Sequence, residues 1–448
     1  MSQAVFESNR VAVETDAVPN DQDLAITGFP GTPVGLMVGM SDGTPDATGT
    51  GHARMTMGFS DGTNERSIAI RAQGGDPVTV NTVQIPSNSH VLNVVNSSTG
   101  AIAGSASHVA ATTPFSDGKA TIEWDNALAT TAFMMNYTLI GGENTEVAVG
   151  DFLSASGAGS TIDVRHTNLT GKPDVIWLLS QAQAFNDTVT DDARFCQGFG
   201  ARGASDEVQQ AYNAWSSEDA AGAAHNNGYQ ASNSRVCGVI DPATPSFLGS
   251  VSIDAWLDDN GSGGGATFET LDSGTQIRYA YMMVRDKVER IEASIEAVDS
   301  ETSTGSQAST TAGFKPQFLE HLSGFGTATL DILHTNANAD PIGRGWASTN
   351  SPTSGVCMSI STDDGNNNAV AESFRDNALG YVERANDTSG LTVSHTSFDT
   401  NGHTLNYDRV LGGAKTQLFL SIKEAETSHP SYGEPDQGRP TPNTLLRM

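Results

Sequence analysis

Apolar and polar residues alternate over short stretches of this chain, and the clearest of these stretches begin at a proline. After Pro33 the apolar residues fall at every second position, Val34, Leu36 and Val38. A period of two puts one side of a segment into a core and the other into water, which is the pattern of a β-strand. Proline suits the start of such a strand because it has no N–H for the ladder. The arrangement recurs at Val175, Trp177 and Leu179 after Pro173, and at Phe318 and Leu322 after Pro316.

Three further features follow each of these strands, always in the same order. A glycine followed by an aromatic residue comes first, then a glycine that leads into an apolar-x-aromatic strand, and finally another alternating strand. The glycine–aromatic pairs of the three copies are Gly58-Phe59, Gly198-Phe199 and Gly345-Trp346. The glycine and the strand that follows it are Gly118 with Ile122-x-Trp124, Gly274 with Ile277-x-Tyr279 and Gly402 with Leu405-x-Tyr407. The final strands are Met135-x-Tyr137-x-Leu139, Ile291-x-Ala293-x-Ile295 and Leu418-x-Leu420-x-Ile422. The opening prolines lie 140 and 143 residues apart (173 − 33 and 316 − 173), so the sequence predicts one unit repeated three times.

We therefore predict an all-β chain of three tandem β-sandwich-like domains with extended N- and C-terminal arms. The predicted boundaries are 1–20 for the N-terminal arm, 21–146, 147–302 and 303–428 for the three repeats, and 429–448 for the C-terminal arm. The last of these segments is rich in proline and poor in apolar residues, so it cannot form a core of its own.

Two stretches fit the repeat less well. Residues Asp286–Val298 carry apolar residues at helical spacing, but we predict a strand there because the corresponding stretches of the other copies alternate. The middle copy also contains an apparent insertion at Ser205–His225. Within it, Ser205 could cap a helix that carries Val208, Tyr212 and Trp215, so Ser205–Trp215 stays open between helix and strand.

Composition agrees with many short strands and narrows the possible partners. The chain has 448 residues, of which 47 are glycine and only 17% are charged. Its 52 acidic and 23 basic side chains give a net charge of −29, which repels phosphate backbones and anionic headgroups. We expect neither nucleic acid nor membrane as a partner. The first residues show no secretory signal, and Cys196, Cys237 and Cys357 are expected to be reduced, buried thiols.

One catalytic motif is present on paper. Gly58-Phe59-Ser60-Asp61-Gly62 matches the G-x-S-x-G elbow of serine hydrolases, but that elbow requires a strand-to-helix turn, and the flanks here look like a β-hairpin. The matching positions of the other copies hold Gly200 and Ala347, so the serine is not part of the repeat. We predict that Ser60 is not catalytic. A histidine bonded to Ser60 and itself held by a carboxylate would contradict that prediction.

No metal or cofactor site is predicted either. The ten histidines include no H-x-H or H-E-x-x-H pair, and His395 and His403 are expected at the surface. The acidic runs Asp258-Asp259-Asn260-Gly261 and Asp363-Asp364-Gly365-Asn366 lack the spacing of a calcium loop, so we interpret them as ordinary turns. The sequence therefore predicts no catalytic, cofactor-binding or metal-ligating residue, and no enzyme.

The repeated stretches resemble modules of exterior structural and tail-fibre-like proteins of tailed bacteriophages. They are ITGFPGTPVGLMVG, RMTMGFSDG and SDGKATIEW in the first copy and TAGFKPQFLEHL, GRGWAS and TNGHTLNY in the third, while the middle copy departs from them with Leu169 in place of the phenylalanine. The resemblance implies a virion component, assembled in the host cytoplasm and displayed on the particle as capsid decoration or a head- or tail-attached fibre. It implies other virion proteins as partners, in a homo-oligomer or symmetric assembly.

Two other functions are considered. In a glycan-binding adhesin, exposed rings such as Trp215, Trp256 and Trp346 would stack on host sugars. A secreted glycan hydrolase would need a pair of carboxylates in a cleft, and the sequence offers no candidate pair. For the C-terminal arm we predict an assembly strap from about His429 to Met448 that lies against a neighbouring protein, because its four prolines favour extended backbone.

Overall fold

Every regular element that the structure describes is a β-strand, which confirms the predicted all-β class. The structure is a computed structural model and describes residues 4–13, 20–41, 47–50, 52–73, 82–96, 99–126, 133–219, 227–244, 246–272, 275–324, 330–335, 342–349, 355–362, 370–383, 390–410 and 415–423. The strands form six antiparallel sheets. They pair off into three modules, each with a long sheet of seven strands and a short sheet of four or five.

Module 1 has a long sheet in the order β1-β12-β3-β5-β6-β7-β16 and a short sheet in the order β10-β11-β9-β8, with β2 also paired to β11. Its own strands are β1 (Val5–Ala12), β2 (Asn20–Ala25), β3 (Pro33–Ser41), β4 (Ala47–Thr50), β5 (His52–Ser60), β6 (Glu65–Gln73), β7 (Thr82–Ser87), β8 (Leu92–Val95), β9 (Ile102–Ser107), β10 (Phe115–Ser116), β11 (Lys119–Trp124) and β12 (Met134–Gly141).

Module 2 repeats this order, with a long sheet β13-β23-β15-β17-β18-β19-β27 and a short sheet β14-β22-β21-β20. Its own strands are β13 (Thr145–Leu153), β14 (Thr161–His166), β15 (Val175–Ser180), β16 (Thr190–Asp191), β17 (Ala193–Arg202), β18 (Val208–Ser217), β19 (Asn227–Ser232), β20 (Cys237–Asp241), β21 (Ser246–Leu257), β22 (Gly264–Thr270) and β23 (Arg278–Asp286).

Module 3 does so again, with a long sheet β24-β34-β26-β28-β29-β30-β4 and a short sheet β25-β33-β32-β31. Its own strands are β24 (Ala293–Asp299), β25 (Gly305–Ser309), β26 (Pro316–Gly324), β27 (His334–Thr335), β28 (Ile342–Ser348), β29 (Val356–Thr362), β30 (Val370–Arg375), β31 (Gly380–Glu383), β32 (Gly390–Asp399), β33 (Gly402–Arg409) and β34 (Thr416–Lys423).

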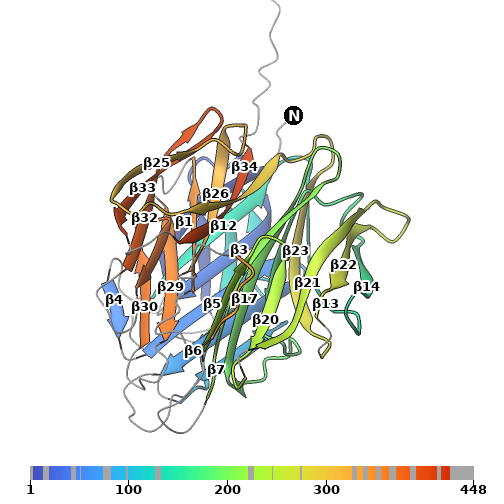
Figure 1. Cartoon of the computed structure of the whole chain (residues 1–448). Helices are drawn as coiled ribbons and strands as arrows, with labels where there is room; N and C mark the ends of the chain where they lie inside the picture. The colour runs from blue at the N-terminus through green and yellow to red at the C-terminus, as the bar shows by residue number, and fades with distance from the viewer. Residues whose placement is uncertain are drawn as a thin grey trace, which may run out of the picture.

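The seventh strand of each long sheet comes from a different module. Strand β16 of module 2 pairs with β7 of module 1, and β27 of module 3 pairs with β19 of module 2. Strand β4 of module 1 pairs with β30 of module 3, and Figure 1 shows these two strands side by side although they are far apart in the sequence. The three exchanges close a ring, so the modules are joined more tightly than separate tandem domains would be.

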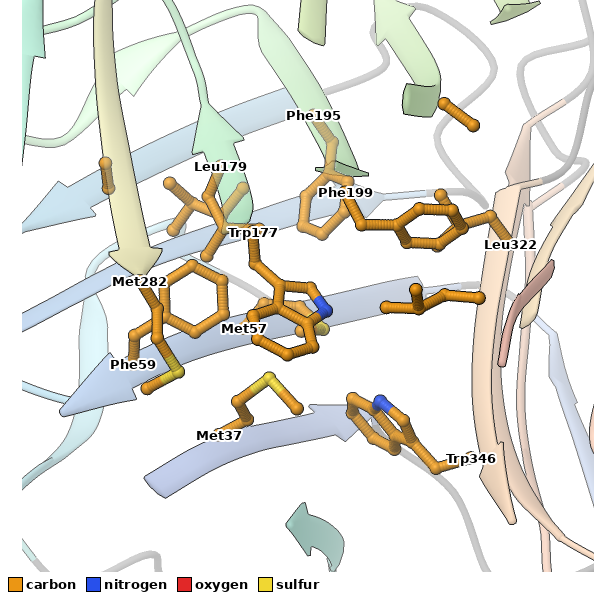
Figure 2. Packing of buried hydrophobic residues seen from close by; sticks show 14 of the residues in the cluster. Met37, Met57, Phe59, Trp177, Leu179, Phe195, Phe199, Met282, Leu322 and Trp346 are labelled. Carbon is orange, nitrogen blue, oxygen red and sulfur yellow. The ribbon is translucent and has the colours of Figure 1, made fainter. Parts of the chain in front are cut away.

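Each long sheet also buries both of its faces. One face packs on the short sheet of its own module and makes a separate sandwich core. The other face turns toward the two remaining long sheets, and all three contribute to one cluster, which we call the axial core. Figure 2 shows Met37, Met57 and Phe59 of module 1 meeting Trp177 of module 2 and Trp346 of module 3 in this cluster. Apolar burial of this extent is the main force that holds the modules together.

The glycine–aromatic pairs have the same role in all three modules. The rings of Phe59, Phe199 and Trp346 are fully buried in the axial core, and they sit at matching registers opposite Met37, Trp177 and Glu320. A Cβ on the preceding glycine would lie only 1.7–1.9 Å from a backbone carbonyl oxygen, which belongs to Val91, Val236 or Leu379. The glycine is therefore required by the close approach of another strand rather than by a bend in its own.

The N-terminal boundary differs from the one that the sequence predicts. Residues Val5–Ala12, assigned to an arm, form strand β1 at the edge of the module 1 long sheet. Phe6 of this strand is fully buried in the axial core, with ring centroids 6.1 Å from Trp177 and 5.8 Å from Phe318. After Val5 and Phe6 the strand continues with Glu7, Ser8, Asn9 and Arg10, which are polar on both faces, so the sequence shows no alternation there. The C-terminal segment 429–448 lies outside the described residues.

The middle module required two corrections of strand assignment. The predicted third and fourth features of this copy are each displaced by one strand, because Ile277-x-Tyr279 runs into β23 and Ile291-x-Ala293-x-Ile295 runs into β24, the first strand of module 3. Module 3 therefore begins before residue 303. The part of Ser205–His225 that the structure describes is no insertion: β18 pairs with β17 along its whole length, so Ser205–Trp215 is not a helix.

Candidate functional site

Ser60 is the residue with the clearest catalytic motif, and the structure does bond it to a histidine. It ends β5, and its Oγ lies 2.7 Å from Nδ1 of His108, which follows β9. The other ring nitrogen of His108, Nε2, lies 2.8 Å from the carbonyl oxygen of Pro114. A carbonyl can only accept, so Nε2 carries the proton and Nδ1 accepts the hydrogen bond from the Ser60 hydroxyl.

A carboxylate is present as well, but it does not hold the imidazole. Glu65, at the start of β6, accepts hydrogen bonds from the backbone N–H of His108 at 2.8 Å and from Oγ of Ser107 at 2.7 Å. Burial raises the pKa of Glu65, and these hydrogen bonds offset the effect only in part. In a serine hydrolase the carboxylate orients the imidazole ring itself. Here the ring is oriented by the carbonyl of Pro114. Ser60 is therefore bonded to a histidine, but that histidine is not held by a carboxylate, and the prediction that Ser60 is not catalytic is not contradicted.

The surroundings of this pair restrict its chemistry. Ser60 and His108 are both fully buried. The ring of Phe115 packs edge-on against the imidazole, with the two ring centroids 4.4 Å apart. Burial lowers the pKa of His108 to about 4, so the ring is neutral at physiological pH. The N–H of Gly62 donates to Ser60 Oγ at 3.1 Å, so this amide is not aimed at a developing oxyanion. What the network does is fasten the β5–β6 turn to the loop that follows β9.

Other residues singled out in the sequence also have structural surroundings. Asp259 Oδ1 accepts hydrogen bonds from the N–H groups of Gly261 and Gly263, which makes an ordinary Asx turn. The run Asp363–Asn366 lies outside the described residues. Across the described part of the chain, no three His, Cys, Asp or Glu side chains gather as a metal site would require. Within the same residues, no helix is long and apolar enough to cross a membrane.

Two expectations about buried residues were wrong. His395 and His403 were expected at the surface, but they are 6% and 0% exposed in the sandwich of module 3. Cys196 and Cys237 were expected as thiols, but they form a disulfide with a Cα–Cα distance of 6.2 Å. The bond joins β17 of the long sheet to β20 of the short sheet. A sequence separation of 41 residues gave no sign of this contact.

The tryptophans proposed for sugar stacking are not available for it. Trp215 and Trp346 are fully buried in the axial core, and Trp256 is 6% exposed in the sandwich core of module 2. Their rings fill the spaces between sheets, as large aromatic side chains commonly do. The adhesin hypothesis therefore loses the three residues on which it was based.

A pocket of about 420 Å³ lies where the modules join. It is lined by Ala4, at the beginning of the described chain, by Lys423, at its end, and by Asp286, Glu289 and neighbouring residues of the module 2–module 3 connection. The N–H of Ala4 donates to Asp286 Oδ2 at 3.1 Å. The start of β1 and the end of β34 thus lie at the same end of the molecule.

The sequence reasoning missed a repeated contact between modules. Asp187 and Asp331 follow β15 and β26 at corresponding positions, both with positive φ, and their N–H groups donate to carbonyls of the preceding module, those of Pro86 and Ala231. Their carboxylates accept hydrogen bonds from Ser89 Oγ at 2.7 Å and from Ser234 Oγ at 2.9 Å. We call these contacts clasps. The signal was present as the related pentapeptides SNSHV (87–91) and SNSRV (232–236).

Comparison with known proteins adds no identity to this picture. No protein-family model matches the chain, and none of the curated proteins is detectably similar to it.

Proposed function

We propose that this protein is a structural component of a tailed-phage virion, displayed on the particle exterior and bound to neighbouring virion proteins. The observation that carries the proposal is the closed ring of three exchanged strands around one axial core. Such a body resists separation of its modules, since each is held by a strand of another as well as by shared apolar surface. Resistance to separation is what a particle component needs.

Two further observations agree with this function. The best catalytic candidate, Ser60, is buried in a network that fastens two loops together. Both ends of the described chain, Ala4 and Lys423, lie at one pocket, so segments beyond them would leave from the same end of the molecule. That position suits the predicted strap at 429–448. A strap from this end would leave the opposite end of the molecule free to face solvent.

The test is reconstitution on particles. Particles made without this protein would be mixed with the purified full chain, washed, and analysed for bound copies per particle. We expect saturable binding at a fixed copy number. A matched chain ending at residue 429 should unfold at nearly the same temperature and bind more weakly, because the strap proposal assigns the removed segment to contacts with the particle. Absence of binding by the full chain would contradict the virion proposal, whereas full binding by the shortened chain would contradict only the strap.

A further inference from the structure

The contact between modules 1 and 2 has a titratable group at its centre. The connection from β15 to β16 crosses onto module 1, where Gln181 Nε2 donates to the carbonyl of Ala69 at 2.8 Å and the Asp187 N–H donates to that of Pro86 at 2.9 Å. His90 of module 1 sits beside this connection, in the turn between β7 and β8. Its side chain is 20% exposed.

The imidazole of His90 lies between two carboxylates from different modules. Nε2 is 2.8 Å from Oδ2 of Asp125, which follows β11 of module 1, and Nδ1 is 3.3 Å from Oδ1 of Asp187 of module 2. Oγ of Ser89 also reaches Nδ1, at 2.9 Å, and donates to Asp187 Oδ2. Ionised carboxylates only accept, so the ring can donate to both only when both nitrogens carry a proton. The neutral ring has one N–H and must leave one carboxylate without its bond.

The carboxylates around the ring all favour its protonated form. The hydrogen bond to Asp187 raises the pKa of His90, as does the one to Asp125, while burial opposes both. Burial alone would raise the pKa of Asp187, but hydrogen bonds from His90, Ser87 and Ser89 outweigh it and bring the pKa to about 2. One further carboxyl acts on the ring, that of Glu65 on β6. Within the part of the chain that the structure describes, the charged groups that act on His90 are these three carboxyls.

The corresponding clasp between modules 2 and 3 has a permanent charge in this place. Arg235 occupies the position of His90 in the related pentapeptide, and its Nη1 lies 2.8 Å from Oδ2 of Asp272. Ser232 and Ser234 hold Asp331 there, as Ser89 holds Asp187. Guanidinium does not lose its proton in the range that proteins experience, so the charge at this position of the second clasp does not change with pH.

We propose that His90 makes the module 1–module 2 clasp pH-sensitive, so that protonation fastens the exchanged strand β16 to module 1 and deprotonation loosens it. The pKa of His90 is higher in the folded chain than the unfolded value of 6.5. The contribution to stability is therefore complete below pH 6.5 and is lost as the pH rises through the folded value. Loosening is local, because the Arg235 clasp and the axial core remain.

Hydrogen exchange of the full chain tests this with an internal control. Protection factors of the peptide containing Asp187 would be compared between pH 5.5 and pH 8.5 with those of the peptide containing Asp331. The quantity compared is the protection factor of the Asp187 peptide divided by that of the Asp331 peptide. We expect this ratio to be roughly 1.5- to 5-fold lower at pH 8.5 than at pH 5.5, which is the range that partly exposed ion pairs support. His90→Arg should remove the dependence on pH and keep the protection high. His90→Gln should give the lower protection at both pH values, and unchanged protection at Asp331 would show that each variant is folded.

Two outcomes would overturn the proposal. One is a wild-type ratio that does not change with pH. The other is a ratio that changes equally in wild type and in His90→Arg, which would place the titrating group elsewhere.

Discussion

Modules 2 and 3 have the same strand order but bury different kinds of side chain. At three matching positions of the sandwich, module 2 has an apolar residue or glycine where module 3 has an ionisable residue. Leu178 of module 2 matches His321 of module 3, Ala266 matches His403, and Gly150 matches Glu296. At two matching positions of the axial core, module 2 has Trp177 and Gln197 where module 3 has Glu320 and Arg344. One backbone arrangement thus accepts both interiors.

The two ionisable groups at the axis are well supplied with partners. Arg344 Nη2 lies 2.5 Å from Glu320 Oε1, and Trp177 Nε1 donates to Glu320 Oε2 at 2.6 Å. Burial raises the pKa of Glu320, and Arg344 and Trp177 counteract that effect. A buried pair of this kind is tolerated because each charge meets the other and Trp177 donates a further hydrogen bond to Glu320. The ion pair also distinguishes the axial face of module 3 from the axial faces of modules 1 and 2.

The ionisable groups in the module 3 sandwich are supplied less well. Nε2 of His403 is 3.5 Å from Glu296 Oε1, and within the described residues neither ring nitrogen has a hydrogen bond. Burial lowers the pKa of His403 to about 4 and that of His321 to the same value, although His321 is hydrogen-bonded to Gln417 and Leu379. The comparison teaches that the fold accepts a buried ion pair at the axis, and two neutral imidazoles beside a carboxyl of raised pKa, Glu296, in the module 3 sandwich. Four experiments can break or sharpen this contrast.

The largest effect is expected from removing one member of the axial pair. Glu320→Met leaves the Arg344 charge buried without its partner and should cost about 3–5 kcal/mol. Glu320→Met combined with Arg344→Met copies module 1, which has Met37 and Met57 at these positions, and should lie within about 1 kcal/mol of wild type. Guanidinium unfolding midpoints measure both. A double variant as unstable as the single one would show that the pair is required for packing.

Truncation of the axial rings should have nearly as large an effect. Phe199→Ala and Trp346→Ala each open a cavity in the axial core and should cost about 3–5 kcal/mol. Val288→Ala, at a side chain that is 57% exposed, is the control and should change stability by less than about 0.5 kcal/mol. The same unfolding measurement applies. Near-normal stability of either ring variant would contradict the equivalence of the three glycine–aromatic pairs.

Acid should destabilise module 3 through two buried imidazoles. His321 and His403 have folded pKa values of about 4 against 6.5 when unfolded, so the folded state binds fewer protons between these values. Stability is therefore complete above pH 6.5 and falls as the pH drops toward 4. Glu296 acts in the opposite sense, because burial raises its pKa.

Replacing the imidazoles by the residues of module 2 tests this pH dependence. His403→Ala combined with His321→Leu should reduce the loss of free energy of unfolding between pH 7 and pH 4.5 by about 2 kcal/mol for each imidazole removed. The variant Val288→Ala, at an exposed position, leaves both groups and their neighbours in place and serves as the control. An unchanged acid response in the double variant would assign it to other groups.

The smallest effect is expected at Ser60. Ser60→Ala leaves Nδ1 of the buried His108 without its donor and should cost about 1–2 kcal/mol, with no change in incorporation into particles. Thermal unfolding and the particle-binding assay measure the two parts of this prediction. Loss of a measurable hydrolytic activity in the variant would show that the pair has a catalytic role.

The sequence was sufficient for the fold class and for three of the rings at the axis. Alternation and the opening prolines identified β3, β15 and β26 correctly, and the glycine–aromatic pairs marked rings that all three modules bury. These features could be found because core positions and close backbone contacts restrict the residue type. The same alternation could not tell one buried strand from the next, which is why Tyr279 and Ala293 were matched to the wrong strands.

The contacts between modules could not be predicted in the same way. The exchanged strands β4, β16 and β27 have two to four residues, too few to show a period. His108 contacts Ser60, and His90 contacts Asp125 and Asp187, which are all distant in the sequence. Neither histidine lies in a sequence motif from which its partner could be predicted. The polarity of His403 suggested a surface position, since burial of an unpaired imidazole is unfavourable and is seldom expected.

Strand β4 has a consequence for the order of synthesis. Thr50 pairs with Ala371, so 321 residues (371 − 50) must be added before its partner exists. At a translation rate of about 5–20 residues per second, that is a wait of roughly 16–64 s. Throughout this interval the newborn chain carries an unmatched edge, to which another growing chain could add. Ribosomes spaced closely on one message would raise that risk, and slow loading would reduce it.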